Sequence, residues 1–557
     1  MSASVAVPQP SPAQLAGAIA GAVPYDLSKS PLVGIVGVIL GAGIVTLAGR
    51  LLTLGLADLK GHVGIGFDEG AWISTSFNAA LIFIGPMTVY LGGLLGPRRV
   101  LLFGAGTFTL LSVFLPFVHA YSLLIAALLL AGLTSGTFYP LTLTFALRNI
   151  PIRFLPFTIA LYATSVDFSV NVAPTLYGWC RDHLSWHWMF WTSAVITPVM
   201  MVCIYWGIPA TPAAKRSGPA PSFAGFLYGS AGLAILFAAL DQGERLDWWR
   251  SGVFTSLIVS GSFLLLCAIL RRLFGPNPFV AIPFLGKWNT LLLGATLFFF
   301  RFILLSTIVL IPQALAIHGF EADQIGPALI WTALPQLPVA LAIAALLRSN
   351  VDSRLIMATG FAMVALACWM NANLTSAWSA SNFYRTELLM GAGQSFAFIG
   401  LVSTIILQGL FSGAMAKPQW ILTFSAFFHT VRLFGGNVGA ISMGHFIAQR
   451  EKFHSNVLGL HVEQGNWITD GSIRQLTAGI FAKSSGLAEA TGRAVGIMSG
   501  RVRLQAYTLT LTDGFYLIAG VCIATMLLNA FLRGSPLQYG DLVLFQHRPA
   551  SPQEAQS

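Results

Sequence analysis

Five charged residues interrupt long apolar stretches of this chain, namely Arg50, Asp167, Arg301, Glu387 and Arg432. A charged side chain inside a membrane costs about 2.5–3.5 kcal/mol on insertion scales, so it is retained where it faces a protein interior or a watery cavity. The functional interpretation makes Arg50 and Arg301 the receptors for an anionic group. Asp167 or Glu387 would then carry a proton, as carboxyl groups do in membrane relays.

A packing interpretation competes with the functional one. It makes Arg50–Asp167 and Arg385–Glu387 ion pairs that hold neighbouring helices together, and Arg50–Asp167 is the buried pair we expect. Arg385 can extend to the outer interface of a membrane, which favours packing for this residue. Either interpretation suits Arg432.

Uncharged polar residues also lie within the apolar stretches. We interpret them mainly as hydrogen-bonding groups between helices and only secondarily as ligand contacts. These residues are Asn78, Asn171, Gln313, Gln336, Gln394 and Gln408.

The composition indicates which elements must position these side chains. The 557 residues include 30 Lys and Arg and 20 Asp and Glu, so that 9% are charged, against roughly 25% in an average soluble domain. Hydrophobic residues make up 55% of the chain. So few charges cannot cover a soluble fold, which excludes soluble enzymes, disordered proteins and disulfide scaffolds. The composition predicts an all-α polytopic membrane protein.

No sequence motif indicates an enzyme. The chain has no G-x-x-x-x-G-K-[ST], H-E-x-x-H or G-x-S-x-G segment, which argues against ATP hydrolysis and against the corresponding hydrolases. Its five cysteines include no C-x-x-C pair, so neither a metal site nor a disulfide framework is predicted. We expect no cofactor apart from a proton as coupling ion, and no nucleic-acid partner.

Apolar segments of about 20 residues, long enough to cross a bilayer as helices, recur along the chain. They predict fourteen membrane spans near residues 32–57, 70–95, 100–118, 122–147, 154–180, 189–208, 223–240, 252–270, 289–317, 325–347, 355–373, 383–412, 419–447 and 512–532.

Basic residues are distributed unevenly between the two sets of alternating loops and tails. One set contains Lys29, Arg98, Arg99, Arg148, Arg153, Lys215, Arg216, Arg271, Arg272, Lys287, Arg348, Arg354, Lys417, Arg533 and Arg548. The short loops of the opposite set contain only Lys60, Arg181, Arg245 and Arg250. The positive-inside rule therefore predicts that both termini are cytoplasmic.

A Pro- and Ala-rich break, Pro209–Ser222, follows the sixth span and precedes an additional pair of spans. This order predicts two six-helix bundles separated by an inserted pair, as in transporters with internal repeats. The predicted parts are an N-terminal tail (1–31), a first bundle (32–208), a linker with the inserted pair (209–288), a second bundle (289–532) with a long outer stretch (448–511), and a C-terminal tail (533–557). The outer stretch could cap the outer mouth, meet a partner protein, or extend the last two spans as interfacial helices.

Several motifs appear together in a familiar order. They are GGLLGPRR at Gly92–Arg99, NVAPTLYG at Asn171–Gly178, RDHLSWHWMFW at Arg181–Trp191, FFHTVRLFGGNVGAI at Phe427–Ile441, and LQAYTLTLTDGFY at Leu504–Tyr516. Over roughly residues 32–532 the chain resembles the EmrB/QacA-type fourteen-helix drug:proton antiporters of the major facilitator superfamily. The resemblance implies two six-helix bundles around a central cavity that opens alternately to each side.

Two family motifs are retained with changes. The cytoplasmic turn G-x-L-a-D-r-x-G-r-r keeps Gly92 or Gly93, Gly96, Arg98 and Arg99, but lacks its Asp. We expect the basic pair to bind the carbonyl groups at cytoplasmic helix ends, which carry partial negative charge. The family's antiporter motif in the fifth span survives as Ala173, Pro174 and Gly178.

Two other family positions have lost their charge. In the first span Ala48 stands where the family has an acid, and in the fourth span Leu128–Gly132 lacks the family's Arg. The usual proton-coupling residues are therefore absent at both positions.

The resemblance implies a secondary active transporter in a bacterial inner membrane, which exports amphipathic, drug-like or organic-anion compounds and is driven by protons. It also implies a small-molecule substrate and a lipid environment. Some family members have a periplasmic adaptor and an outer-membrane channel as partners. The alternatives are proton-coupled uptake of an organic acid and a membrane sensor or scaffold that transports nothing.

Overall fold

A computed structural model describes residues 28–210, 223–274, 286–411, 418–463, 465–536 and 538–545. Every regular element in these ranges is a helix, which agrees with the predicted all-α class and with the need to satisfy backbone hydrogen bonds within each membrane segment. Most of the predicted linker and the larger part of both predicted tails lie outside the described residues.

The first bundle contains the helices between Pro31 and Gly207. α2 packs against α7, α8 and α9, while α4 packs against α6 and α5 against α9. Proline stands in the first turn of α2, α5 and α8, where the helix needs no amide hydrogen from it. The elements are α2 (Pro31–Leu54), α3 (Leu56–Val63), α4 (Phe67–Leu95), α5 (Pro97–Phe114), η1 (Leu115–Phe117), α6 (Tyr121–Ser135), α7 (Phe138–Asn149), η2 (Ile152–Phe154), α8 (Leu155–His183) and α9 (Trp188–Gly207).

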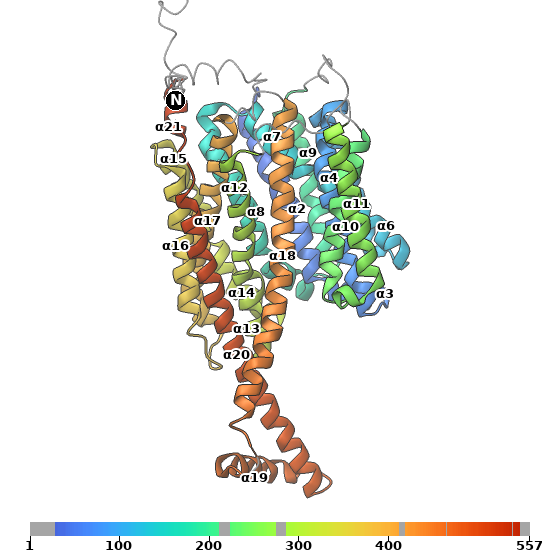
Figure 1. The fold of residues 1–557 in the computed structure, drawn as a ribbon, viewed down its shortest axis with the longest axis vertical. Coiled ribbons are helices and arrows are strands. Elements are labelled where there is room, and N and C mark those ends of the chain that lie inside the picture. Colours follow the sequence, from blue (N-terminus) through green and yellow to red (C-terminus); the bar gives the residue numbers. More distant parts are fainter. Residues whose placement is uncertain are drawn as a thin grey trace, which may run out of the picture.

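The inserted pair consists of α10 (Phe223–Gly243) and α11 (Gly252–Phe274), with η3 (Trp248–Arg250) between them. α10 packs against α11, against α4 of the first bundle and, less extensively, against α18 of the second. The amide of Gln242 donates to the Ala71 carbonyl at 3.1 Å, and Arg245 pairs with Asp68 at 2.8 Å. These contacts attach the inserted pair chiefly to α4 (Figure 1).

The second bundle begins at Trp288, and two of its predicted spans are interrupted. The span predicted at 289–317 includes a π-helical segment, and the one predicted at 325–347 is divided in two near Pro335. The elements are α12 (Trp288–Ile303), η4 (Ser306–Leu310), α13 (Ile311–Ile317), α14 (Ala322–Ala333), α15 (Gln336–Arg348), α16 (Ser353–Asn371), α17 (Ala380–Phe411), α18 (Pro418–Gly459), α19 (Trp467–Phe481), α20 (Leu487–Ala530) and α21 (Tyr539–Phe545).

Twelve helical segments of the described residues are long and apolar enough to cross a membrane, and each matches a predicted span. The two predicted spans outside this set lie on α8 and α18, where Asp167, Asn171, His429 and Arg432 lower the hydropathy. Both helices pack against helices of the two bundles. The count of fourteen spans and the cytoplasmic termini stay predictions.

Two helices continue far beyond the bundles. α18 has 42 residues and α20 has 44, which at 1.5 Å per residue gives about 63 and 66 Å, against about 30 Å of hydrocarbon. Arg450 and His454 on α18 contact the Asp513 carboxylate on α20 at 2.5 and 2.7 Å. The predicted outer stretch 448–511 therefore mostly extends these helices, and with α19 it forms an arm that projects away from the bundles (Figure 1). We call the side from which it projects the arm end.

Candidate functional site

The predicted charges gather where the two bundles meet. α8 of the first bundle packs against α14, α15 and α17 of the second, and α18 of the second packs against α4 and α7 of the first. Arg50 lies on α2, Asp167 on α8, Arg301 on α12 and Arg432 on α18. Each bundle thus contributes two of these four side chains.

Two of the arginines bind across this interface. Arg50 Nη2 donates to the carbonyl of Ile308 in η4 at 3.2 Å, and Arg432 Nη1 donates to Thr46 Oγ1 on α2 at 3.3 Å. The Arg432 guanidinium also lies 4.3 Å from the centroid of the Tyr139 ring. Since both make neutral contacts, their charges stay uncompensated by any ion pair between described residues.

Arg301 lies where α12 and α18 approach closely. A Cβ atom at Gly436 would lie 3.4 Å from Arg301 Nη2, and one at Gly435 would lie 3.0 Å from the backbone of Phe298. One turn further along α18, a Cβ atom at Gly439 would lie 3.3 Å from the next turn of α12. These small residues let the two helices approach closely and make room for Arg301.

Asp167 is the buried carboxylate of this group, with 1% of its surface exposed. Neither carboxylate oxygen has a hydrogen-bond partner among the described residues, and the cations that act on it are Arg301 and Arg432. The predicted ion pair between Arg50 and Asp167 is wrong, because Arg50 bonds to the backbone of η4 while Asp167 interacts with cations of α12 and α18. Three arginines and one carboxylate leave an excess of positive charge.

Glu387 lies apart from this group, inside the second bundle. It is fully buried on α17 and accepts a hydrogen bond from Thr332 of α14. Arg385 is exposed, so the predicted Arg385–Glu387 pair is also wrong. Two residues along a helix differ by about 200°, so these side chains leave α17 in nearly opposite directions.

A chain of buried amides joins the bundles. Asn171 Nδ2 on α8 donates to Gln394 Oε1 on α17 at 2.9 Å, and Gln394 Nε2 donates to Thr307 Oγ1 of η4 at 3.3 Å. Both amide side chains are almost completely buried. The interpretation of these two residues as hydrogen-bonding groups between helices is therefore confirmed.

Aromatic rings that no sequence motif singles out lie beside Arg432. The Tyr139 ring stacks on the imidazole of His429 at 5.0 Å and lies 5.5 Å from the Tyr162 ring. His429 is fully buried, and neither of its nitrogens has a hydrogen-bond partner among the described residues. His429 lies three residues before Arg432, so the two share a helix face. This spacing is the sequence signal that could have identified His429 as a neighbour of Arg432.

In the turn between α4 and α5, one arginine of the predicted basic pair binds a helix end. Gly96 has a φ of 88°, a conformation that favours glycine. Arg98 Nη2 donates to the carbonyl of Tyr205, in the last turn of α9, at 2.6 Å. Arg99 is exposed, and Gly92 is buried against Leu422 of α18 whereas Gly93 is open. The bond of Arg98 suits the partial negative charge at a helix C-terminus.

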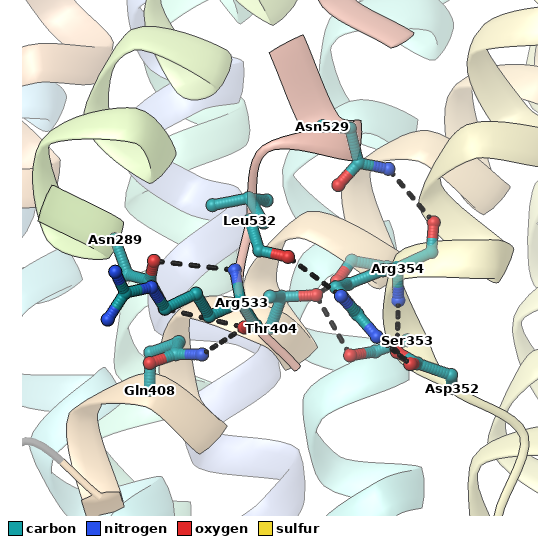
Figure 2. Close-up of polar contacts among 10 residues, drawn as sticks. Asn289, Asp352, Ser353, Arg354, Thr404, Gln408, Asn529, Leu532 and Arg533 are labelled. Atoms are coloured by element: carbon teal, nitrogen blue, oxygen red, sulfur yellow. Dashed lines mark hydrogen bonds and ion pairs between the residues drawn. The ribbon is translucent and has the colours of Figure 1, made fainter. Parts of the chain in front are cut away.

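The second bundle contains an equivalent contact that the sequence reasoning missed. Arg354, at the start of α16, donates to the Leu532 carbonyl just beyond α20 at 2.7 Å and pairs with Asp352 at 2.7 Å. Figure 2 shows both contacts, with the neighbouring bonds of Asn529 and Arg533. The segment Asp-Ser-Arg after the tenth predicted span was the sequence signal, because it places an Asp before a basic residue in a turn.

The family's antiporter motif packs against the second bundle. Ala173, Pro174 and Gly178 are buried on α8, and Thr175 Oγ1 donates to the Gly326 carbonyl on α14 at 2.6 Å. A Cβ atom at Gly326 would lie 2.9 Å from Thr175 Cα. This stretch of α8 therefore forms a close contact between the bundles.

The two positions that lack the family's charges line one pocket. Ala48 of α2 faces Leu128 and Ala131 of α6 there, with mostly apolar neighbours. Two positions where the resemblance leads us to expect an acid and a base thus meet in space, and both hold apolar side chains here.

Comparison with known proteins assigns the family. The sequence profile described as Major Facilitator Superfamily matches residues 38–447. The chain belongs to the Major Facilitator Superfamily. It is thus a multi-pass membrane transporter and not an enzyme, and the prediction of secondary active transport is confirmed.

Curated relatives support the more specific resemblance. The multidrug export protein EmrB of Haemophilus influenzae is 24% identical over 435 residues, which cover 76% of this chain and 82% of the relative. The probable multidrug resistance protein EmrY of Escherichia coli is 25% identical, with 75% and 80% covered. The fatty acid resistance protein FarB of Neisseria gonorrhoeae is 21% identical, with 86% and 92% covered. The predicted resemblance to EmrB-type transporters is confirmed.

Solved structures show the same fold. The human organic anion transporter MFSD10 aligns with a TM-score of 0.51 at 14% identity, covering 90% of this chain and 99% of that protein. The proton:xylose symporter XylE aligns with a TM-score of 0.55 at 12% identity, covering 92% and 98%. At such low identities these likenesses describe the architecture alone.

Proposed function

We propose that this transporter exports amphipathic organic anions and is driven by the proton gradient. The observation that supports the proposal is the excess of positive charge, among the described residues, where the bundles meet. Arg50, Arg301 and Arg432 converge from three helices, and Asp167 is the buried carboxylate near them. An anionic group on the substrate would compensate this charge, whereas a lipophilic cation would be repelled by it.

The side chains around the arginines suit an amphipathic molecule. Tyr139, Tyr162 and His429 present rings beside Arg432, and pockets for such ligands combine aromatic walls with a few polar groups. The relatives named for export of drugs and resistance to fatty acids support export over uptake.

We place the protein in a bacterial inner membrane with the arm outside. The relatives are bacterial, and the excess of basic residues in the loops opposite the arm supports this orientation through the positive-inside rule. Both termini would then be cytoplasmic.

The experiment compares two permanently charged amphipathic probes in energised cells, the anion 8-anilinonaphthalene-1-sulfonate and the cation ethidium. We expect export of the anion, loss of export after a protonophore, and selective loss in Arg50→Gln and Arg301→Gln. Arg385→Gln, which removes an exposed arginine, is the matched control and should export normally. Export of ethidium at an equal rate, or unchanged export after the protonophore, would contradict the proposal, and uptake instead of export would support the alternative direction.

We further propose that the arm binds a periplasmic adaptor that leads to an outer-membrane channel. The arm exposes large apolar side chains, including Leu460, Trp467 and Leu487, and apolar surface of this kind suits contact with another protein. Replacement of α19 by a short glycine linker should abolish export from intact cells while transport in inner-membrane vesicles continues. Equal loss in both preparations would contradict a role restricted to a partner.

A further inference from the structure

Glu387 occupies a position close to the arm end of the second bundle. α17 begins at Ala380, so Glu387 lies seven residues, or about 10 Å, from the end of its helix. Asn371, the last residue of α16, lies beside it. Two helical turns therefore separate the carboxyl group from the solvent at the arm end.

No cation compensates this carboxyl group among the described residues. Its Oε2 accepts from Thr332, the Asn371 amide acts on it, and Oε1 is buried without a partner. The titratable group that faces it is the Cys368 thiol of α16. Arg385 on the same helix is exposed.

The charged residues on the other helices packed against α17 do not reach Glu387. Asp167 on α8 and Arg301 on α12 act on one another, and neither acts on Glu387. Within the part of the chain that the structure describes, α14 and α15 present no ionised group to it. A fully buried carboxylate without a cationic partner is strongly disfavoured, so this group must bind a proton or another cation.

The two buried carboxyl groups therefore have different electrostatic surroundings. Both carboxyl groups are desolvated by burial, but two arginines act on Asp167, whereas the groups that act on Glu387 among the described residues are neutral. In the first bundle, Ala48, Leu128 and Ala131 line one mostly apolar pocket, where the resemblance to the family leads us to expect an acid and an arginine. Proton coupling at those positions has no titratable group to use.

Glu387 is connected to the contact between the bundles through α14. Thr332, its hydrogen-bond partner, lies at the end of α14, just before the break near Pro335. The same helix contacts α8 at the other end, where Thr175 donates to Gly326. A change in the bonding of Glu387 would therefore act on α14 and on its contact with the antiporter motif.

We propose that Glu387 is the proton-binding residue of this transporter and controls the α14–α8 contact. The inference rests on the proposed proton-driven export. A proton from the solution at the arm end binds Oε1, which forms a neutral O–H group that is compatible with burial, and the α14–α8 contact closes. Loss of that proton to the opposite side restores the carboxylate, which favours conformations that admit water.

The first test needs no substrate. Infrared difference spectra of the purified protein, recorded through a pH titration, should show the carbonyl band of a buried protonated carboxyl group. We expect this band in the wild type and in Asp167→Asn, and its absence in Glu387→Gln. Thr332→Val, which removes the hydrogen bond and keeps the carboxyl group, should shift the band. A band that disappears in Asp167→Asn and persists in Glu387→Gln would overturn the inference.

The second test measures 8-anilinonaphthalene-1-sulfonate in proteoliposomes with the membrane potential clamped at zero. With one proton per anion, the wild type should accumulate the probe about tenfold per unit of pH gradient. Glu387→Gln should accumulate the probe only to a ratio near one, and any probe exchange that it retains should not depend on pH. Normal accumulation by Glu387→Gln, or accumulation driven by a Na⁺ gradient at constant pH, would overturn the inference. Absence of any probe exchange in the wild type would instead refute the proposed substrate class, while the infrared result still decides on Glu387.

Discussion

Removal of the hydrogen bond between Asn171 and Gln394 should weaken the closed contact between the bundles. The bond is 2.9 Å long, and its partners are 3% and 0% exposed. Asn171→Ala leaves the Gln394 oxygen buried without a donor, which costs about 1–3 kcal/mol. Interhelical hydrogen bonds in membrane proteins contribute about 0.6 kcal/mol on average and at most about 1.7. We therefore expect a loss near 1.4 kcal/mol, or about tenfold in the population of the closed arrangement.

The assay measures distances between spin labels at exposed positions on opposite bundles. Leu184 follows α8 and Asn373 follows α16, both at the arm end and both exposed, and the labels replace them in a variant without native cysteines. Asn171→Ala should shift the distance distribution towards longer separations. Gln394→Ala should do the same.

The double variant provides the critical result. Once both partners are gone, no buried amide oxygen is left without a donor, so the two effects should fall short of additivity by about 1 kcal/mol. Additive effects, or an unchanged distance distribution in both single variants, would refute the reasoning that this bond holds the bundles together.

Three further substitutions test other contacts. Gly435→Ala should lower the denaturation temperature because its methyl group meets the α12 backbone at 3.0 Å, whereas Gly436→Ala, with 3.4 Å to a flexible side chain, should be tolerated; equal effects would contradict the close helix approach. Gly96→Ala forces a residue with a side chain to a φ of 88°, so it should destabilise the protein by about 1 kcal/mol, and an unchanged thermal denaturation curve would show that the turn adapts. Arg354→Gln removes an ion pair and a 2.7 Å bond to the Leu532 carbonyl, which should cost about 1.5 kcal/mol in a group that is one-third exposed; a variant as heat-stable as the wild type would refute this.

The sequence predicted the helices well because each needs about 20 apolar residues in a row, a local property. The same reasoning identified Asp167 and Glu387 as buried, since a charge within such a run must face protein or water. The spans predicted on α8 and α18 stay predictions, because polar residues reduce the apolar signal of these two helices. These are the helices that hold Asn171, His429 and Arg432 between the bundles.

Partners of the buried charges could not be predicted. The pairing of Arg50 depends on the rotation of α2 and on a π-helical turn at Ser306–Leu310, and neither leaves a periodic pattern in the sequence. Glu387 and Thr332 are 55 residues apart and meet through the packing of α14 on α17. The Ala48 pocket likewise appears only when α2 and α6 are placed together.

The most direct test of the account is the affinity of the purified protein for 8-anilinonaphthalene-1-sulfonate and for ethidium, measured by fluorescence titration at low salt. We predict that the wild type binds the anion at least tenfold more tightly than the cation, and that Arg301→Gln reduces this preference while Arg385→Gln does not. Equal binding of the two probes, or a preference for ethidium, would contradict the claim that the unpaired arginines between the bundles form an anion site.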